Sequence, residues 1–377
     1  MKKIQLKIKI LLSFVLTLLF VLVSCQSSDK DSQSNKNLIT PVSALQKSDP
    51  TEISIMTYNV ENLFDTTHDK DREDFPNLPL AEKSKPEVIA FCSAIKSNYR
   101  RQECEQLDWN ESVLKIKLQN VAAVIRTLDG GKGPDVLLVA EVENEAILKR
   151  LVTDQLAELG YQTVILREGP DLRGIDPGFI SKFPLVGKPK LHLVPYTEAD
   201  PEKLKWARRS RGILEATVKL PNKKSLTFLV GHFPSQSNPT EWRAQAVAFA
   251  KNLMAEKIKK GEAVVLGGDL NITERENESH GFFNKELSEV GYVSHLIGCK
   301  HCLGTHSYKG GWDFLDVLIF SKNLKDAGVE LITDSFQVVR TSENMKRNGT
   351  PLSFDSTKKV MGVSDHFPLY SRLRLLK

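Results

Sequence analysis

The chain has 377 residues and a formal net charge of +5. Residues 1–24 contribute four lysines and no acidic residue, so the charge of the remaining chain falls to about +1. A value this small excludes any inference of nucleic-acid binding from bulk charge alone. The roughly 325 residues beyond position 50 have room for one large domain or two ordinary ones. They show neither an internal repeat nor a second change in composition, so we expect one domain.

The first residues have the features of a secretory signal peptide. Lysines precede an apolar run over residues 10–23, which is too short for a typical membrane-spanning helix. The run ends in Leu22-Val23-Ser24-Cys25, which resembles a bacterial lipobox, in which the cysteine becomes the lipidated first residue of the mature chain. We therefore expect an extracytoplasmic lipoprotein anchored to a membrane through Cys25. An uncleaved membrane anchor is the alternative.

The next stretch, residues 26–50, is rich in Ser, Gln, Asn, Lys and Asp. Such a composition has little apolar surface to bury and is typical of disorder. We predict a signal peptide over residues 1–24, a lipidated cysteine and disordered tether over residues 25–50, and a folded domain over residues 51–377.

Four cysteines lie beyond the lipobox, and an even number outside the cytoplasm indicates disulfides. The simplest pairing joins neighbours in the sequence, Cys92 with Cys104 and Cys299 with Cys302. A zinc site built from the second pair and His301 is the alternative, although a second Cys-x-x-Cys motif is missing.

The first half of the domain alternates strands with helices. Residues 52–58 predict a strand, and residues 66–109 have no sustained period and predict an insertion or long surface excursion. A helix is expected from Asn110, and one face of it is apolar: Leu114, Leu118, Val121, Ile125 and Leu128. A buried strand over residues 135–140 and a helix from Asn144 follow, which is typical of a mixed α/β fold.

The second half continues this pattern after a polar loop over residues 169–176. We expect strands over residues 211–219 and 226–230, and then a helix opened by Asn238 as its cap and Pro239 in its first turn. The predicted buried stripe of that helix consists of Trp242, Ala246, Phe249 and Leu253. Further strands are expected over residues 314–321 and at the C-terminus.

The most informative stretch is the apolar run Val264-Val265-Leu266, which is followed by Gly267-Gly268-Asp269-Leu270-Asn271. The glycines allow close approach of backbone to backbone or ligand. If the strand geometry persists, Asp269 and Asn271 point to one spot. A carboxylate that orients or deprotonates a nucleophile, beside an amide that donates hydrogen bonds, suits phosphate chemistry. A turn at the end of a strand is the alternative.

Other apolar strands end in the same way. The polar residues at or after their ends are Asn59, Glu141, His232, Asp269 with Asn271, and Asp365 with His366. One such acid is usually a turn former. Five strands that end in residues capable of catalysis indicate a shared active site.

These motifs, in this order, resemble the endonuclease/exonuclease/phosphatase superfamily. The resemblance rests on Met56-Thr57-Tyr58-Asn59-Val60-Glu61-Asn62, Val139-Ala140-Glu141-Val142-Glu143, Gly231-His232, Gly268-Asp269-Leu270-Asn271, Trp312-Asp313-Phe314-Leu315-Asp316 and Ser364-Asp365-His366. It spans nearly all of residues 51–377. The usual glutamine before the central glutamate is Ala140 here. The resemblance implies a sandwich of two β-sheets flanked by helices, whereas periodicity alone predicts only a mixed α/β fold.

The resemblance also implies roles for the motif residues. Asn59, Glu141 and Asp365 would hold Mg²⁺ or Mn²⁺, which are hard ions that prefer oxygen ligands. His366 would be the general base, oriented by Asp316.

The remaining motif residues would act on the phosphate. His232 would protonate the leaving oxygen or bind the phosphate, and Asp269 and Asn271 would orient water and stabilise the transition state. Arg173 and Arg211 are weaker candidates for phosphate contacts or structural roles.

We therefore expect a monomeric, metal-dependent phosphodiesterase. The motifs Asn-Val-Glu-Asn-Leu-Phe-Asp and Asp-x-Arg-Gly-Ile-Asp resemble the bacterial secreted or surface nucleases of the superfamily, so nucleic acid is the expected substrate. Lysines and an arginine in residues 341–359 suit a phosphate backbone. A sphingomyelinase or phosphoinositide phosphatase is the alternative within the superfamily. A non-catalytic surface binding protein is the alternative from another class.

Overall fold

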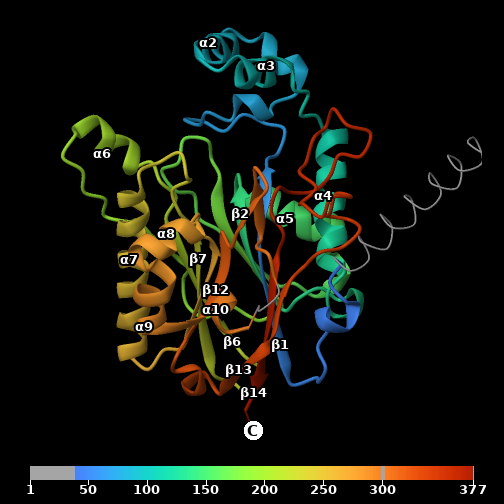
Figure 1. Ribbon diagram of the computed structural model, residues 1–377. Helices are drawn as coiled ribbons and strands as arrows, with labels where there is room; N and C mark the ends of the chain where they lie inside the picture. The colour runs from blue at the N-terminus through green and yellow to red at the C-terminus, as the bar shows by residue number, and fades with distance from the viewer. Residues whose placement is uncertain (1–38, 299–301, 377) are drawn as a thin grey trace, which may run out of the picture.

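The computed structural model describes residues 39–298 and 302–376, which form a four-layer α/β/β/α sandwich (Figure 1). The first sheet has the strand order β13-β14-β1-β2-β4-β3. Its strands are β1 (Glu52–Leu63), β2 (Val136–Val142), β3 (Thr163–Leu166), β4 (Asp176–Ser181), β13 (Val329–Val338) and β14 (Leu369–Leu375). The two-sheet sandwich expected from the motifs is confirmed.

The second sheet has the strand order β5-β6-β7-β8-β12-β9. Its strands are β5 (Lys190–His192), β6 (Ile213–Lys219), β7 (Ser225–His232), β8 (Val264–Asp269), β9 (Gly291–Val293) and β12 (Asp316–Ser321). A short hairpin of β10 (His306–Tyr308) and β11 (Gly311–Asp313) lies outside both sheets. In each sheet the central pair, β1 with β2 and β7 with β8, is parallel.

Helices cover the outer faces. The longer ones are α4 (Glu111–Arg126) and α5 (Glu145–Gln155) on the first sheet and α7 (Thr240–Lys259) on the second. The others are α2 (Pro86–Ala94), α3 (Asn98–Gln106), α6 (Pro201–Ala207), α8 (Glu274–His280), α9 (Ser288–Val290) and α10 (Ser294–Ile297), with a π-helical turn at Phe282–Leu287. In the part of the chain that the structure describes, no helix is long and apolar enough to span a bilayer.

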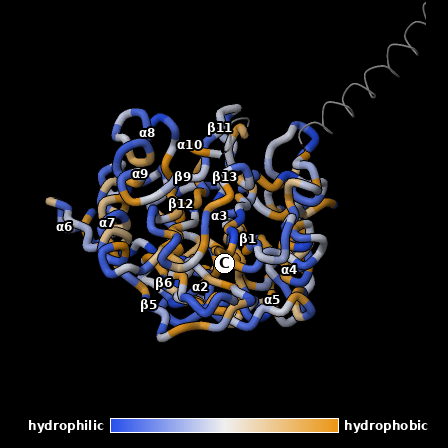
Figure 2. Tube along the Cα trace, turned by 90° about the horizontal axis from the view of Figure 1, so that it is seen from below, coloured by the Kyte–Doolittle hydropathy of each residue, from blue (hydrophilic) through white to orange (hydrophobic). Residues whose placement is uncertain are grey.

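Successive side chains of β1 point to opposite faces of the first sheet, and both faces are covered. Ile53 and Ile55 pack between the two sheets, whereas Met56 and Tyr58 pack against α4 and α5. Seen along the sheets, the apolar segments lie mainly inside and the hydrophilic ones mainly at the periphery (Figure 2).

Two glycines allow the close packing at the end of β8. A Cβ on Gly267 would lie 2.5 Å from Leu138 of the facing sheet. Gly268 has φ +137°, and a Cβ there would lie 1.9 Å from the carbonyl oxygen of Gly231. Only glycine fits both positions, as the sequence predicted.

The predicted helices begin close to the expected residues. Asn110 caps α4, and Asn144 caps α5 by accepting a hydrogen bond from the Ile147 N–H. The prediction for α7 was partly wrong, because Pro239 is its cap and the Asn238 side chain donates to Ser235 instead. In the predicted stripe of α7, Phe249 and Leu253 are only partly buried.

The excursion over residues 66–109 lies beyond the end of the sandwich at which β1 ends (Figure 1). It contains α2 and α3, which the sequence did not predict because neither has a continuous apolar face. The predicted disulfide Cys92–Cys104 joins them, and Lys83 donates to the carbonyl oxygens of Pro76 and Cys104. The second predicted pairing involves Cys299, which lies outside the described residues.

The N-terminal boundary of the folded part was predicted too late in the chain. A 3₁₀ turn at Val42–Leu45 packs on the domain, where Leu45 is 1% exposed. Thr40 donates to the carbonyl oxygen of Val338, and Lys47 forms an ion pair with Asp135. The segment from Thr40 onward therefore belongs to the packed structure and not to a tether. The predicted signal peptide and Cys25 lie outside the described residues.

One buried ion-pair group gives a test of stability against pH. Glu215 of β6 accepts from His192 at 2.7 Å and from Lys257 of α7 at 2.8 Å. The hydrogen bond from His192, and then that from Lys257, lowers the pKa of Glu215 from 4.5 to about 2, although burial opposes the shift. We expect Glu215→Gln to lower the free energy of unfolding by about 1–3 kcal/mol at neutral pH.

The sign of the pH dependence follows from the lowered pKa. The contribution of Glu215 is complete above about pH 4.5 and is lost as the pH falls toward 2. Urea unfolding at several pH values measures it. A destabilisation that stays constant from neutral pH to pH 2 would contradict this assignment.

Candidate active site

The polar residues meet at one end of the sandwich because three strands of the second sheet deliver them in one row. His232 ends β7 and pairs in register with Asp269, which ends the parallel strand β8. Asp316 begins the antiparallel strand β12 and pairs with Asp269 from the other side. Residues an even number of positions apart on a strand point to the same face. Phe228, Val265 and Leu318 stand in this relation to the three site residues and face the space between the sheets, so the row of site residues faces it too.

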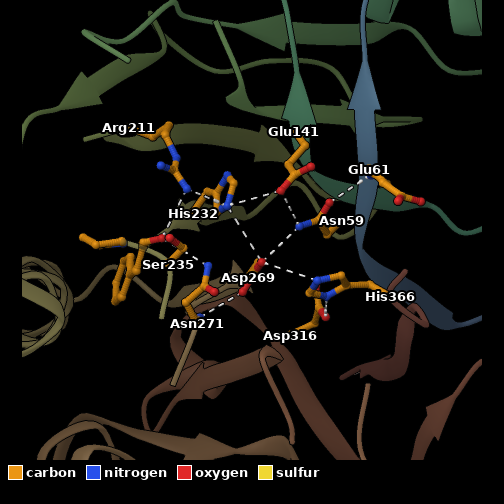
Figure 3. A network of polar contacts seen from close by, with 12 residues as sticks. Asn59, Glu61, Glu141, Arg211, His232, Ser235, Asp269, Asn271, Asp316 and His366 are labelled. Carbon is orange, nitrogen blue, oxygen red and sulfur yellow. Dashed lines mark hydrogen bonds and ion pairs between the residues drawn. The ribbon is translucent and has the colours of Figure 1, made fainter. Parts of the chain in front are cut away.

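Asn59 of β1 faces this row from the first sheet. Its Nδ2 donates to Oε1 of Glu141 at 3.1 Å and to Oδ2 of Asp269 at 3.0 Å (Figure 3). Its Oδ1 accepts from the Glu61 N–H. Asn59 therefore links the two carboxylates. In this orientation the amide nitrogen faces the carboxylates, and the expected role of Asn59 as a metal ligand stays a prediction.

Glu141 lies at an irregularity shared by β1 and β2. The pairing of the two strands shifts between Asn59 and Leu63, and Glu61, Asn62 and Glu141 all have positive φ angles between 52° and 64°. Non-glycine residues in this region cost of order 1 kcal/mol each and cluster at functional sites. The bulge turns the Glu141 carboxylate toward the row, where Oε2 also accepts from the Asn62 N–H at 3.1 Å.

The contact predicted between His366 and Asp316 is present. Nδ1 of His366 donates to Oδ2 of Asp316 at 2.6 Å, and both side chains are buried. Nε2 of His366 then faces Asp269, with 3.9 Å between Nε2 and Oδ2. Burial favours the neutral ring, but the carboxylates of Asp316, Asp365 and Asp269 raise the pKa of His366 well above its ordinary value.

His232 has a different environment. Arg211 donates from Nη2 to Nε2 of His232 at 2.7 Å, so this ring nitrogen carries no proton. Arg211 is itself held by Asp171 at 3.1 Å. Burial, and then the charge of Arg211, lowers the pKa of His232 well below its ordinary value. Nε2 of His232 lies 3.7 Å from Glu141 and 3.8 Å from Asp269.

Asp269 is at the centre of the site, as Figure 3 shows. Burial raises its pKa to about 7, and the neighbouring carboxylates of Asp316 and Glu141 add to the rise. The strand geometry does not persist beyond Asp269, because Asn271 has φ 52°. The Asn271 N–H donates to Oδ1 of Asp269 at 2.9 Å and its side chain donates to the carbonyl oxygen of Phe233, so Asn271 fixes this corner.

Sequence reasoning missed Lys117 and Glu61, which hold the loops of the site. Lys117 of α4 is fully buried and donates to the carbonyl oxygens of Glu61 and Val363 at 2.9 and 2.6 Å. The Glu61 carboxylate accepts from Ser353 and from the Phe354 N–H. Burial lowers the pKa of Lys117 to about 8 and raises that of Glu61 to about 7. A lysine on the apolar face of the predicted helix was the available signal.

His306 was also missed. Its ring lies 4.8 Å from that of His366, between centroids, and its backbone forms a bridge with that residue. Of the weaker candidates, Arg211 lies in the site, whereas the Arg173 side chain is 57% exposed beside Asp171.

The donor set fits a hard divalent cation. Glu141 and Asp365 have solvent-accessible carboxylates, at 19% and 47% exposure, and the buried acids Asp269 and Asp316 add negative charge. Glu141 and Asp365 are therefore the residues that would hold Mg²⁺ or Mn²⁺. Such an ion supplies charge for a phosphate and lowers the pKa of bound water. The roles predicted for the individual residues stay predictions.

A pocket adjoins these residues on the side of the excursion. It has a volume of about 750 Å³ and lies between α3 and the loop over residues 352–360. Glu61 and Asn62 line its inner end, and Lys346 and Lys358 lie in its wall. The pocket is linked to the site through Asn62, which lines the pocket and whose N–H also contacts Glu141.

A sequence profile described as Endonuclease/Exonuclease/phosphatase family matches residues 96–375, most of the chain. The chain belongs to this family. The enzymes that give the family its name hydrolyse phosphate esters and typically depend on a divalent metal ion. The superfamily expected from the motifs is thus confirmed. Among curated proteins, no relative was found by sequence.

Solved structures of this family and of related enzymes share the fold at low sequence identity. An endonuclease/exonuclease/phosphatase from Beutenbergia cavernae DSM 12333 has a TM-score of 0.52 at 16% identity, over 86% of this chain and 72% of that one. Truncated TDP2 from Caenorhabditis elegans has a TM-score of 0.50 at 14% identity, over 88% and 99%. A mannosyl-6-phosphatase from Bacteroides thetaiotaomicron VPI-5482 has a TM-score of 0.50 at 14% identity, over 85% and 99%.

Proposed function

We propose that the protein is a metal-dependent phosphodiesterase and that its substrate is nucleic acid. One observation carries the proposal: the side chains that surround the carboxylate of Asp269. They are the hydrogen-bonded pair Asp316 and His366, together with Glu141 and His232. A phosphodiester needs charge neutralisation and an activated water molecule, and this arrangement offers groups for both.

The protonation states of His366, Asp269 and His232 indicate a different role for each residue. The carboxylates around His366 raise its pKa well above the ordinary value, which favours a proton on Nε2 that can contact a phosphate oxygen, and the Asp269 carboxylate is the group that accepts the proton of the attacking water. Asp316 keeps the His366 ring in one orientation and one tautomer. His232 is neutral and its Nε2 accepts from Arg211, so this atom has no proton to donate to the leaving oxygen; the ring instead holds the Arg211 guanidinium at the site, where its positive charge suits a phosphate.

The pocket supports a substrate that extends beyond the cleaved phosphate. Lys346 and Lys358 in its wall suit the next phosphates of a polynucleotide, whose binding weakens as salt rises. Its rim also exposes Tyr99 and Val360, at 75% and 67%, and these side chains favour a membrane phospholipid as the second candidate substrate.

A substrate panel tests the proposal. We expect the purified protein with Mg²⁺ or Mn²⁺ to cleave plasmid DNA or RNA, with an apparent affinity that falls as salt rises. Sphingomyelin vesicles are the comparison substrate. Hydrolysis of sphingomyelin without cleavage of DNA or RNA would overturn the choice of substrate and leave the phosphodiesterase chemistry in place.

We also propose that the protein is a bacterial lipoprotein, anchored to a membrane outside the cytoplasm through lipidated Cys25. The lipobox-like ending of the N-terminal apolar run supports this localisation. We expect Cys25→Ala to release the protein from the membrane fraction while its specific activity stays unchanged, because Cys25 precedes the packed domain. Fractionation by ultracentrifugation measures the release, and a variant that stays in the membrane pellet would contradict the anchor.

A further inference from the structure

His306, Asp365 and His366 form a cluster on the solvent side of the site. One possible ligand atom from each residue lies within 4.8 Å of those from the other two. The Asp365 side chain is 47% exposed and His306 is half-buried, so an ion from solvent can reach the cluster. Ligands about 2.1 Å from a tetrahedral ion lie roughly 3.4 Å apart, so small side-chain rotations are sufficient to bring these atoms to one ion.

The backbone fixes the three residues relative to one another. His306 and His366 form an isolated antiparallel bridge, and the Phe367 N–H donates to the carbonyl oxygen of Thr305 at 2.7 Å. Thr305 is fully buried, and its Oγ1 accepts from the Asp316 N–H. Little ordering is therefore needed for the three side chains to meet at an ion.

His366 also has the partner that a metal-binding histidine requires. Its Nδ1 is held by Asp316, so Nε2 is the nitrogen that faces Asp365, with 3.9 Å between Nε2 and Oδ1. Histidines that bind metals almost always donate their other ring N–H to a carboxylate or a carbonyl, which fixes the ring and its tautomer.

The cluster shares Asp365 with the site around Glu141 but differs from it in its two imidazole nitrogens. Two imidazole nitrogens and one carboxylate suit Zn²⁺ and similar transition-metal ions, whereas Mg²⁺ prefers oxygen ligands. We propose that His306, Asp365 and His366 form a second, transition-metal site and that Zn²⁺ bound there inhibits the enzyme. Inhibition follows because the ion displaces the proton of His366 Nε2 and occupies this atom, which faces Asp269 and the substrate phosphate. The inhibition rests on the proposed function, but the binding does not.

Binding is tested with the full-length protein, freed of metal and then supplied with excess Mg²⁺, so that a transition-metal ion binds only where nitrogen ligands let it compete with Mg²⁺ for the shared Asp365. Co²⁺ is the probe, because its visible absorption reports coordination by nitrogen, and Zn²⁺ should displace it. We expect one such site and a loss of at least tenfold in affinity in His306→Phe, which keeps a ring beside His366 but has no ligand atom.

His68→Phe is the matched control, because His68 also contacts a carboxylate, Asp74, outside the cluster. It should bind Co²⁺ like the wild type. His306→Gln serves as a second variant if the phenylalanine side chain disturbs the fold, as measured by circular dichroism. Equal Co²⁺ spectra and affinities in the wild type and in folded His306 variants would overturn the site.

The second arm measures hydrolysis with Mg²⁺ at increasing Zn²⁺ concentrations. We expect Zn²⁺ to inhibit the wild type and the His68 variant, and at least tenfold more Zn²⁺ to be needed for His306→Phe. Identical Zn²⁺ inhibition in all three would overturn the regulatory role. If none of the proteins hydrolyses a phosphodiester, the proposed function fails, while the Co²⁺ spectra still decide the metal site.

Discussion

Glu141→Gln should reduce phosphodiester hydrolysis by a factor on the order of 10²–10³ or more while the protein stays folded. The substitution removes one negative charge at the position that would hold the divalent cation and changes little of the shape. Asn59 keeps its second hydrogen bond, to Asp269 at 3.0 Å, so we expect the Asn59 side chain to stay in place in the variant. The measurement compares initial rates at saturating Mg²⁺ or Mn²⁺ with the melting temperatures of the two proteins.

Glu145→Gln is a suitable control for this experiment. Glu145 lies four residues further along the chain, where it pairs with Lys149 and Arg167 on the surface. We expect nearly normal hydrolysis from this variant. Wild-type rates in Glu141→Gln would show that the cation is not held by Glu141.

His366→Ala and His232→Ala should each reduce the rate by a factor on the order of 10²–10⁴. The first removes the cation beside Asp269 and the partner of Asp316, and the second removes the ring that contacts Arg211. We expect the loss in the double variant to be much smaller than the product of the single losses, because one displacement uses both groups. Single-turnover rates of the four proteins measure this.

The two histidines are distinguishable by their neighbours. His366→Ala leaves the buried Asp316 carboxylate without its partner, and burial penalises an unpaired charge, so this variant should also melt at a lower temperature. Nearly normal turnover in either single variant would show that the substituted histidine is structural and not catalytic.

The sequence predicted most of the site because strand periodicity and strand ends are local properties. The run before Asp269 indicated a buried strand, and the glycines indicated close packing, which Gly267 and Gly268 confirm. The resemblance of the motifs to one superfamily supplied the two-sheet architecture and the pairing of Asp316 with His366. Both residues lie far apart in the sequence, so periodicity alone could not bring them together.

Other features depend on tertiary contacts that no local pattern records. Asn59 donates its amide N–H groups to two carboxylates from different sheets, and its oxygen accepts from the Glu61 N–H. Thr40 and Leu45 pack on the domain although their segment is polar overall. His306 reaches His366 only through a hairpin outside both sheets. The helices of the excursion were missed because they pack around a disulfide and a small apolar cluster, and neither has a continuous apolar face.

The dependence of hydrolysis on a divalent metal tests the central claim most directly. The purified wild-type protein is treated with excess chelator, assayed on plasmid DNA, RNA and sphingomyelin vesicles, and assayed again after Mg²⁺ or Mn²⁺ is restored. Hydrolysis of at least one of these phosphodiesters should disappear with the chelator and return with the metal. Full hydrolysis in excess chelator would contradict the account.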